Sequence, residues 1–399
     1  MLQGAKELFE GGRGKVLAFC WLGWVFDFYD LILFAFLKPI IADDLGLSLT
    51  HDLAWIDGWT LAATALGGFF FGRLADRVGR RFALTVSILI YSSGAFLTAF
   101  ADSFEALLIA RLITGIGVGG EWGVGHAVVA EAYPRRLRGR AAGVLQAGSP
   151  VAMAMAAAMG CFAGPVIGWQ TCFLFSAIPA VLVFFARWAM PGEDRAPGRN
   201  AGSLIDLFRG RLLRPSLAML TLLCLHMTGF WCTYAWLPSH LMREVGVAPA
   251  FVGWFQIGVN IGHVVGDLLF GFHADRFGRK RMFTLYCVIS AAGLLAVALA
   301  FEFLAADLVL FGLAMAVTGV GFGTWSCFGV LFAANYDAEI RATAAAGFYN
   351  LSRGVQLFTL PMIGWLVAST GTSTVALHVG AGMALLSAVA IRWVPVVDR

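Results

Sequence analysis

Long apolar stretches separated by short polar breaks run through the whole sequence. A helix that crosses a bilayer needs about 20 mainly apolar residues, and the breaks divide the chain into twelve stretches of this kind. The predicted transmembrane helices are residues 16–37, 55–74, 82–101, 107–131, 140–163, 167–189, 216–238, 250–272, 282–301, 306–332, 342–368 and 374–394. Only 13% of the 399 residues are charged, about half the share found in an average soluble domain. We therefore expect an all-α polytopic membrane protein with no room for a soluble catalytic domain, and thus not an enzyme.

The basic residues predict the orientation of these helices. An even number of spans leaves both termini on one side, and cytoplasmic loops carry the excess of Lys and Arg. The terminal segments and every second loop hold 24 Lys and Arg residues, whereas the opposite side holds only Lys38 and Arg243. Both termini are therefore predicted to be cytoplasmic. We attribute the net charge of +4 to this loop bias, and we expect no nucleic acid as a partner.

The two halves of the sequence repeat each other. The longest polar stretch, residues 190–214, divides the chain into an N-terminal bundle at 1–189 and a C-terminal bundle at 215–399. The segment GRLADRVGRR at 72–81 returns 199 residues later as GFHADRFGRK at 271–280. We therefore predict two six-helix bundles joined by a cytoplasmic linker. Parallel repeats of six helices are a design of secondary transporters, whose substrate site lies between the halves near the membrane midplane.

The repeated loop predicts a gating latch at the cytoplasmic helix ends. A glycine at Gly72 lets one helix end approach its neighbour closely, and a carboxylate accepts bonds from helix N-terminal amides or pairs with an arginine. The predicted gating residues are Gly72, Asp76, Arg77 and Arg80 in the first copy, and Asp275 and Arg276 in the second. A plain basic loop with a turn at Gly79 is the alternative, but two copies at equivalent positions favour the latch.

Several segments of the first half resemble the sialate:proton symporter family of the major facilitator superfamily, which groups sialic acid and monocarboxylate permeases. They are WLGWVFDFYD (21–30), ARLITGIGVGGEWG (110–123), HAVVAEAYPRRLRG (126–139), GWQTCFLFSAIP (168–179) and the Gly72 loop. The resemblance to the superfamily covers the whole chain. It implies the major facilitator fold in a bacterial cytoplasmic membrane, and proton-coupled uptake of an organic anion such as a monocarboxylate or sialate. Glu131 belongs to a pattern shared with related metabolite:proton symporters, and we add it to the gating residues.

Two departures from these families bear on the substrate. Phe28 stands where sialate permeases tend to have glycine, which predicts a smaller pocket than a nine-carbon sugar acid needs. The sequence Gly148-Ser149-Pro150 stands where drug:proton antiporters typically have a glycine-rich array, which disfavours drug export.

Five ionisable residues inside the predicted spans are the candidates for function. A charge at the bilayer centre costs about 2.5–3.5 kcal/mol on insertion scales. With a rise of about 1.5 Å per residue, Asp27, Glu121 and Arg353 fall near the midplane, and Asp30 and Arg111 nearer the outer end. We predict that Asp27 or Asp30 carries the coupling proton, with Glu121 as the next candidate, and that Arg353 binds the substrate carboxylate through its planar guanidinium.

The alternative for Asp27, Asp30 and Arg353 is a static ion pair between helices. For Glu121 it is a structural hydrogen bond sheltered beside the glycines of its own helix. For Arg111, helix packing or an effect on the proton pathway is favoured over direct contact with the substrate. The remaining predicted substrate-binding residues are polar side chains at similar depth: Gln146, Asn350, His226 and Asn260, with Ser149 and His263 nearby. The alternative for each histidine is a packing role. No metal-ligand spacing is found, so we expect neither a metal nor a cofactor.

The sequence thus predicts a secondary active transporter that couples protons to the uptake of an organic anion by alternating access. Its expected partners are that anion, protons and the lipid bilayer, and we expect it to function as a monomer. A facilitator or exporter of organic anions or other metabolites, without proton symport, is the alternative.

Overall fold

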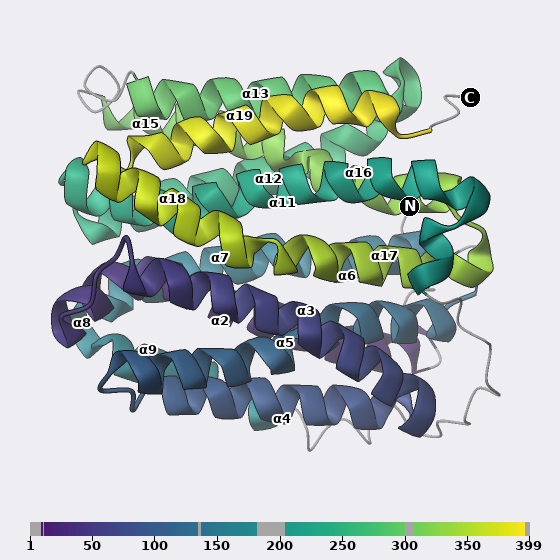
Figure 1. Ribbon diagram of the computed structural model, residues 1–399, viewed down its shortest axis with the longest axis horizontal. Helices are drawn as coiled ribbons and strands as arrows, with labels where there is room; N and C mark the ends of the chain where they lie inside the picture. Colours follow the sequence, from purple (N-terminus) through teal and green to yellow (C-terminus); the bar gives the residue numbers. More distant parts are fainter. Residues whose placement is uncertain (1–8, 11, 135–136, 182–203, 300–306, 396–399) are drawn as a thin grey trace.

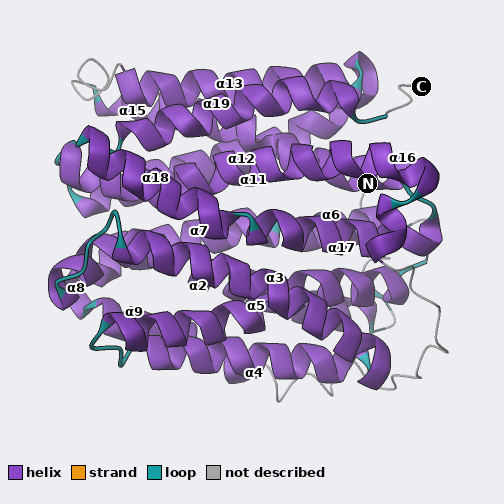
Figure 2. Cartoon of the chain, viewed as in Figure 1, coloured by secondary structure: helices purple, strands orange, loops and turns teal. Residues whose placement is uncertain are grey.

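Twelve helical rods lie side by side in the structure (Figure 1, Figure 2). The computed structural model describes residues 9–10, 12–134, 137–181, 204–299 and 307–395. The rods of the first half are α2 (Arg13–Leu45), α3 (Asp52–Val78), α4 (Arg80–Thr98), α5 (Phe104–Ala132), the broken rod of α6 (Arg138–Gln146), α7 (Gly148–Ala158), η1 (Met159–Ala163) and α8 (Gly164–Ile167), and α9 (Trp169–Ser176) with η2 (Ile178–Val181). The rods of the second half are α11 (Leu213–Ser239) with η5 (His240–Glu244), α12 (Pro249–Phe277), α13 (Arg279–Leu299), α15 (Leu308–Gly321) with η6 (Phe322–Thr324) and α16 (Trp325–Asn335), α17 (Ala338–Gly354) with α18 (Gln356–Thr370), and α19 (Thr374–Ala390) with η7 (Ile391–Trp393).

The predicted twelve-helix architecture is confirmed. Among the described residues, nine helices are long and apolar enough to cross a membrane, and α3, α12 and α9 with η2 complete the set. The first predicted span ends too early, because α2 continues past residue 37 to Leu45. The charge of Lys38 and the proline at Pro39 end the apolar run in the sequence. In the structure, Lys38 is 1% exposed and pairs with Asp57 across 2.6 Å, so its charge is neutralised inside the protein and the helix continues.

Glycines bring the helices of each half into close contact at equivalent places. In the first half, a Cβ atom at Gly67 or Gly119 would overlap the backbone of the facing helix, which shows how closely α3 and α5 approach. In the second half, Gly262 and Gly319 bring α12 and α15 together in the same way. Small residues allow such backbone approach in membranes. These four glycines therefore serve helix packing. The same kind of close helix contact occurs in both halves.

The two halves meet along several pairs of helices, among them α5 and α17. The purple and blue helices of the first half and the green and yellow helices of the second are stacked in Figure 1, and α3 packs against α17 and α18, α2 against α11, and α7 against α12. The predicted linker, residues 190–214, lies largely outside the described residues. Its described part forms η3 (Leu204–Phe208) and η4 (Gly210–Leu212), and Leu204 packs against Gly347 of α17. The predicted bounds of the two halves stay a prediction.

Candidate substrate and proton site

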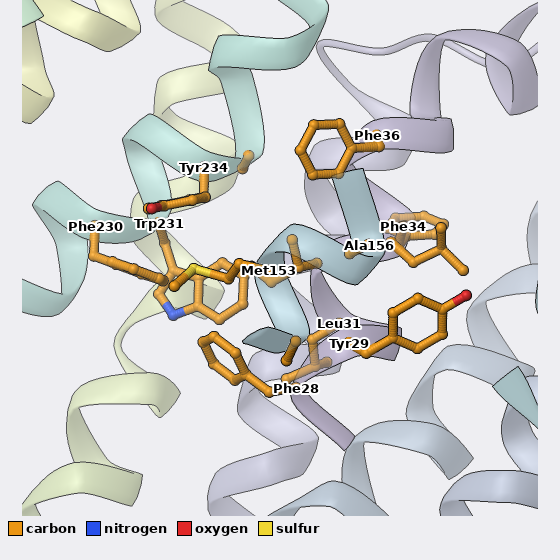
Figure 3. Close-up of a cluster of buried hydrophobic side chains, with 14 of the residues drawn as sticks. Phe28, Tyr29, Leu31, Phe34, Phe36, Met153, Ala156, Phe230, Trp231 and Tyr234 are labelled. Atoms are coloured by element: carbon orange, nitrogen blue, oxygen red, sulfur yellow. The ribbon is translucent and has the colours of Figure 1, made fainter. Parts of the chain in front are cut away.

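A small cavity lies between the two halves, and aromatic side chains form most of its wall. Its lining residues are Phe28, Gln146 and Ser149 from the first half and Met227, Phe230, Trp231, His263, Trp325 and Tyr349 from the second. Figure 3 shows Phe28 of α2 close to Phe230 and Trp231 of α11, with ring centroids 6.2 and 6.4 Å apart. The centre of a water molecule can occupy a volume of only about 20 Å³ in this cavity, which suffices for one water molecule. The structure therefore shows a closed site, which must expand to admit a substrate.

Three charged groups near the cavity lie deep in the apolar interior. Asp27 is 0% exposed, Glu121 is 3% exposed and Arg353 is 1% exposed. Asp27 interacts electrostatically with both Glu121 and Arg353. Glu121 lies beside Gly23, one helical turn before Asp27, and a Cβ atom at Gly23 would lie 2.6 Å from Oε2 of Glu121. The three residues that the sequence placed at one depth therefore form one electrostatic group, which we call the central trio.

The hydrogen bonding of the central trio is incomplete. Among the described residues, neither carboxylate oxygen of Asp27 has a hydrogen-bond partner, and the same holds for Oε1 of Glu121 and Nε of Arg353. Leaving a buried charged group unpaired costs more than the 1–3 kcal/mol of a neutral polar group. Such a cluster is poorly suited to a static packing role, and its open atoms are available to a proton or an anion.

Arg353 is joined to a contact between the two halves. Its Nη2 donates to Oη of Tyr349 at 3.2 Å, and its guanidinium lies 4.7 Å from the centre of the Tyr349 ring. Tyr349 also stacks on Trp122 of α5 with ring centroids 4.2 Å apart and an interplanar angle of 13°. We call this contact the inner stack. It connects the predicted carboxylate binder to the residue that follows Glu121.

Asp30 and Arg111 form a separate buried pair. Nη1 of Arg111 donates to Oδ2 of Asp30 at 2.6 Å, and the two side chains are 0–1% exposed. The guanidinium also lies 4.8 Å from the centre of the Phe34 ring and 5.6 Å from that of Phe173. Neither residue of the pair lines the cavity. The geometry thus corresponds to the alternative of a pair that ties α2 to α5.

The other predicted substrate-binding residues are in different surroundings. Gln146 lines the cavity, whereas Asn350 packs against Gly68 of α3 at the boundary between the halves. Asn260 accepts a hydrogen bond from Oη of Tyr234 at 3.2 Å. His226 lies inside the second half, where its Nε2 is 3.0 Å from Oγ1 of Thr324, and it lines a separate small void.

Sequence reasoning missed four aromatic residues at the site: Trp122, Phe230, Trp325 and Tyr349. Tyr349 could have been found, because it lies four residues before Arg353 and therefore on the same helix face. Trp122 directly follows Glu121 in the segment ARLITGIGVGGEWG (110–123), from which only the two charged residues were predicted as site residues. No local signal in the sequence distinguishes Trp325 from an ordinary packing residue.

The ends of the helices at the predicted outer face hold the two halves together. Arg243 of η5 donates through Nη2 to the backbone oxygen of Pro39 at 2.7 Å and to Oδ1 of Asp43 at 2.6 Å. Nζ of Lys38 lies 5.4 Å from the centre of the Trp236 ring, which belongs to the second half. We call the contacts of Arg243 the outer clasp. They join the two halves at this end of the molecule.

The repeated loops at the opposite end have similar turns. Gly79 and Gly278 adopt positive φ angles of 118° and 91°, which L side chains rarely tolerate. The prediction that Gly72 permits close helix approach is wrong, because a Cβ atom there would meet nothing within 4 Å. Arg80 pairs with Glu131 at 3.0 Å, so these two predicted gating residues tie α4 to α5 within one half.

The remaining latch residues give less information. Arg77 and Arg276 are exposed, and the guanidinium of Arg276 lies 5.2 Å from the centre of the Phe277 ring. The side chains of Asp76 and Asp275 lie outside the described part of the chain. Gating by the latch stays a prediction.

Twelve membrane helices in two repeated halves, around a central cavity with buried charges, define a secondary transporter. The chain belongs to the Major Facilitator Superfamily, whose family model matches residues 20–240 and 219–399. It is a multi-pass protein of the cytoplasmic membrane that transports small metabolites and is not an enzyme.

Similar proteins and structures agree with this assignment. A putative metabolite transport protein of Haemophilus influenzae is 30% identical over 369 residues, covering 88% of this chain and 89% of that protein. The sialic acid transporter NanX of Escherichia coli is 28% identical over 370 residues, covering 86% and 89%. The crystal structure of a D-xylose-proton symporter matches with a TM-score of 0.80 at 20% identity, covering 96% and 98%. The resemblance to sialate permeases is therefore confirmed, and the structural match shows the fold.

Proposed function

We propose that this protein takes up a small organic monocarboxylate together with one proton. The observation that carries the proposal is the central trio, in which one guanidinium and two carboxylates share a buried site next to the cavity. Buried ionisable residues in membrane proteins mark pathways for ions and protons. The name of the relative NanX, a sialic acid transporter, supports an anionic substrate.

Arg353 is the proposed carboxylate binder. Guanidinium binds carboxylate through two parallel hydrogen bonds, and Nε of Arg353 has no partner among the described residues. Its present neighbour, the hydroxyl of Tyr349, is a weak neutral acceptor at 3.2 Å, which a carboxylate oxygen would replace. The aromatic rings of Phe28, Trp231 and Tyr349 around the cavity favour a substrate with a flat, largely apolar body over a polyhydroxylated sugar acid.

Charge balance within the trio gives the proposed stoichiometry. Burying a net charge costs several kcal/mol. The site should therefore be neutral, both empty and loaded, whenever the protein changes the side of the membrane to which the site opens. One arginine cannot balance two carboxylates, so one of these acids is protonated throughout. We assign this standing proton to Glu121, which lies against Gly23, and the coupling proton to Asp27, which interacts with Arg353.

The coupling then follows from competition for one guanidinium. In the empty site, ionised Asp27 balances Arg353. When a substrate carboxylate takes the guanidinium, Asp27 loses its counter-ion and binds a proton, which restores neutrality. One proton enters with each monocarboxylate, and the buried pair of Asp30 and Arg111 stays neutral in both states.

The same binding event reaches the contact between the halves. A carboxylate on Arg353 displaces the hydroxyl of Tyr349 and loosens its stacking on Trp122. Opening of the inner stack would release the substrate to the cytoplasm, while the outer clasp at Arg243 keeps the other end closed.

Uptake into proteoliposomes tests the proposal. With the membrane potential clamped at zero and the lumen one pH unit more alkaline, a labelled flat monocarboxylate such as benzoate should accumulate about tenfold. Arg353→Gln should abolish uptake, and Arg211→Gln is the matched control because Arg211 forms an exposed ion pair with Asp337 at the surface. Uptake that is equal with and without the pH gradient would contradict proton coupling.

A further inference from the structure

The second half contributes side-chain nitrogen atoms to the cavity wall, and the proposed function assigns no role to them. Trp231 and Trp325 line the cavity, and among the described residues Nε1 of each is buried without a hydrogen-bond partner. His263 also lines the cavity, and its Nδ1 is likewise buried and unpartnered. Trp231 and His263 are 4% and 2% exposed, so water outside the protein does not satisfy them.

The three residues come from different helices and line the same cavity. Trp231 belongs to α11, His263 to α12 and Trp325 to α16. Each unsatisfied buried polar group costs about 1–3 kcal/mol, and buried polar groups are nearly always hydrogen-bonded. Three such groups around one cavity indicate a place for a ligand atom. We call the two indole N–H groups the donor wall, because a ring nitrogen of His263 donates only in one of the two tautomers.

The chemistry of the donor wall restricts what it binds. An indole N–H is only a donor, so its ligand atom must be an acceptor. Among the described residues, those that line the cavity include no lysine or arginine, so a second carboxylate would be buried there without a counter-ion, which is costly. A neutral oxygen, such as a hydroxyl or a carbonyl, therefore fits better than a second carboxylate.

We propose that the donor wall is a second subsite, which selects monocarboxylates carrying a neutral hydrogen-bond-accepting oxygen on the side away from the carboxylate. The inference rests on the proposed function, because the carboxylate end is assigned to Arg353. The Tyr349 ring connects the two subsites, since it contacts Arg353 and its centroid lies 6.3 Å from that of Trp325. The donor wall thus determines specificity, while Arg353 supplies the attraction common to all carboxylates.

Binding to purified protein tests this subsite with a matched set of probes. They are benzoate, which lacks a second oxygen, its three monohydroxy isomers, and terephthalate, which carries a second carboxylate. The dissociation constants are measured by calorimetry at one pH. With one hydrogen bond to each of the two indoles, the best hydroxybenzoate should bind roughly 5- to 150-fold more tightly than benzoate. Terephthalate should bind no better than benzoate.

Two variants separate the indole N–H from the ring that carries it. In Trp231→Phe/Trp325→Phe the ratio of the benzoate dissociation constant to that of the hydroxylated probe should fall to threefold or less, whatever happens to the affinity for benzoate itself. Trp24→Phe is the matched control: Nε1 of Trp24 is also buried and unpartnered among the described residues, but Trp24 does not line the cavity. This variant should keep the full preference.

The outcomes separate the subsite from the proposed function. If benzoate binds and hydroxybenzoates bind no more tightly, or if the double variant keeps their preference, the donor wall is overturned and Arg353 stands. A preference for terephthalate also overturns it. If none of the probes binds, the carboxylate site itself is wrong, and the donor wall falls with it.

Discussion

Replacing Asp27 by Asn should convert proton-coupled uptake into electrogenic uptake of the bare anion. In the proposed cycle, Asp27 is the only group whose proton differs between the empty and the loaded site. Asn is nearly isosteric and cannot take up a proton. With Asp27 neutral, the loaded site stays balanced by Arg353 and the substrate, whereas the empty site crosses with one positive charge. Each turnover then moves one negative charge inward and no proton.

The magnitude follows from this charge count. The wild-type protein should accumulate a monocarboxylate about tenfold for one pH unit, alkaline inside, and should ignore the membrane potential. Asp27→Asn should ignore the pH gradient and follow the potential, at tenfold per 59 mV for a single charge. A potassium diffusion potential of 59 mV, positive inside, should therefore give about tenfold accumulation, and the opposite potential should give about one tenth.

Glu121→Gln provides the contrasting variant. Gln imitates a protonated Glu121, so this variant should keep the response to the pH gradient and the indifference to the potential. Uptake is measured with labelled substrate in proteoliposomes, with valinomycin and potassium to set the potential. Tenfold accumulation by Asp27→Asn at one pH unit and zero potential would refute the assignment of Asp27. Loss of coupling in Glu121→Gln with retention in Asp27→Asn would show that the two acids have each other's role.

The remaining predictions concern binding, stability and conformation. Arg353→Lys should weaken substrate binding at least tenfold in calorimetry, because an ammonium group cannot form the two parallel bonds; unchanged affinity would exclude a guanidinium contact. Arg111→Gln should destabilise the protein by about 3–5 kcal/mol through the unpaired Asp30, with recovery in Arg111→Gln/Asp30→Asn; thermal unfolding that fails to recover would show another role. Arg243→Gln should open the outer end and increase thiol labelling of a cysteine placed there, and unchanged labelling would exclude the clasp. Gly119→Val should prevent folding, because its side chain would overlap the backbone of α3, and a normal yield of folded protein would contradict that packing.

The number of helices could be predicted from the sequence because each bilayer span must be a long apolar helix that satisfies its own backbone. Gly119 and Gly319 also pack against facing backbones in their own halves, as small residues do where membrane helices approach closely. The predicted end of the first span was wrong because hydropathy cannot reveal that Lys38 forms an ion pair with Asp57 of another helix. Partners of this kind depend on tertiary packing.

Part of the site was also open to prediction. Depth along each helix placed Asp27, Glu121 and Arg353 at one level, and the structure places them in one electrostatic group. Depth cannot say which way a side chain faces around its helix. For this reason His226 was predicted beside the substrate although it packs inside the second half. For the same reason Trp325 could not be predicted as a cavity residue.

The charge moved per transported anion tests the central claim most directly. Proteoliposomes that contain the wild-type protein are adsorbed on a solid-supported membrane, and a monocarboxylate substrate is added while charge movement and lumenal pH are recorded together. Electroneutral symport of one proton with one monocarboxylate predicts that the lumen is acidified by one proton per anion, with no sustained transport current. A steady current during uptake, or uptake without acidification, would contradict it.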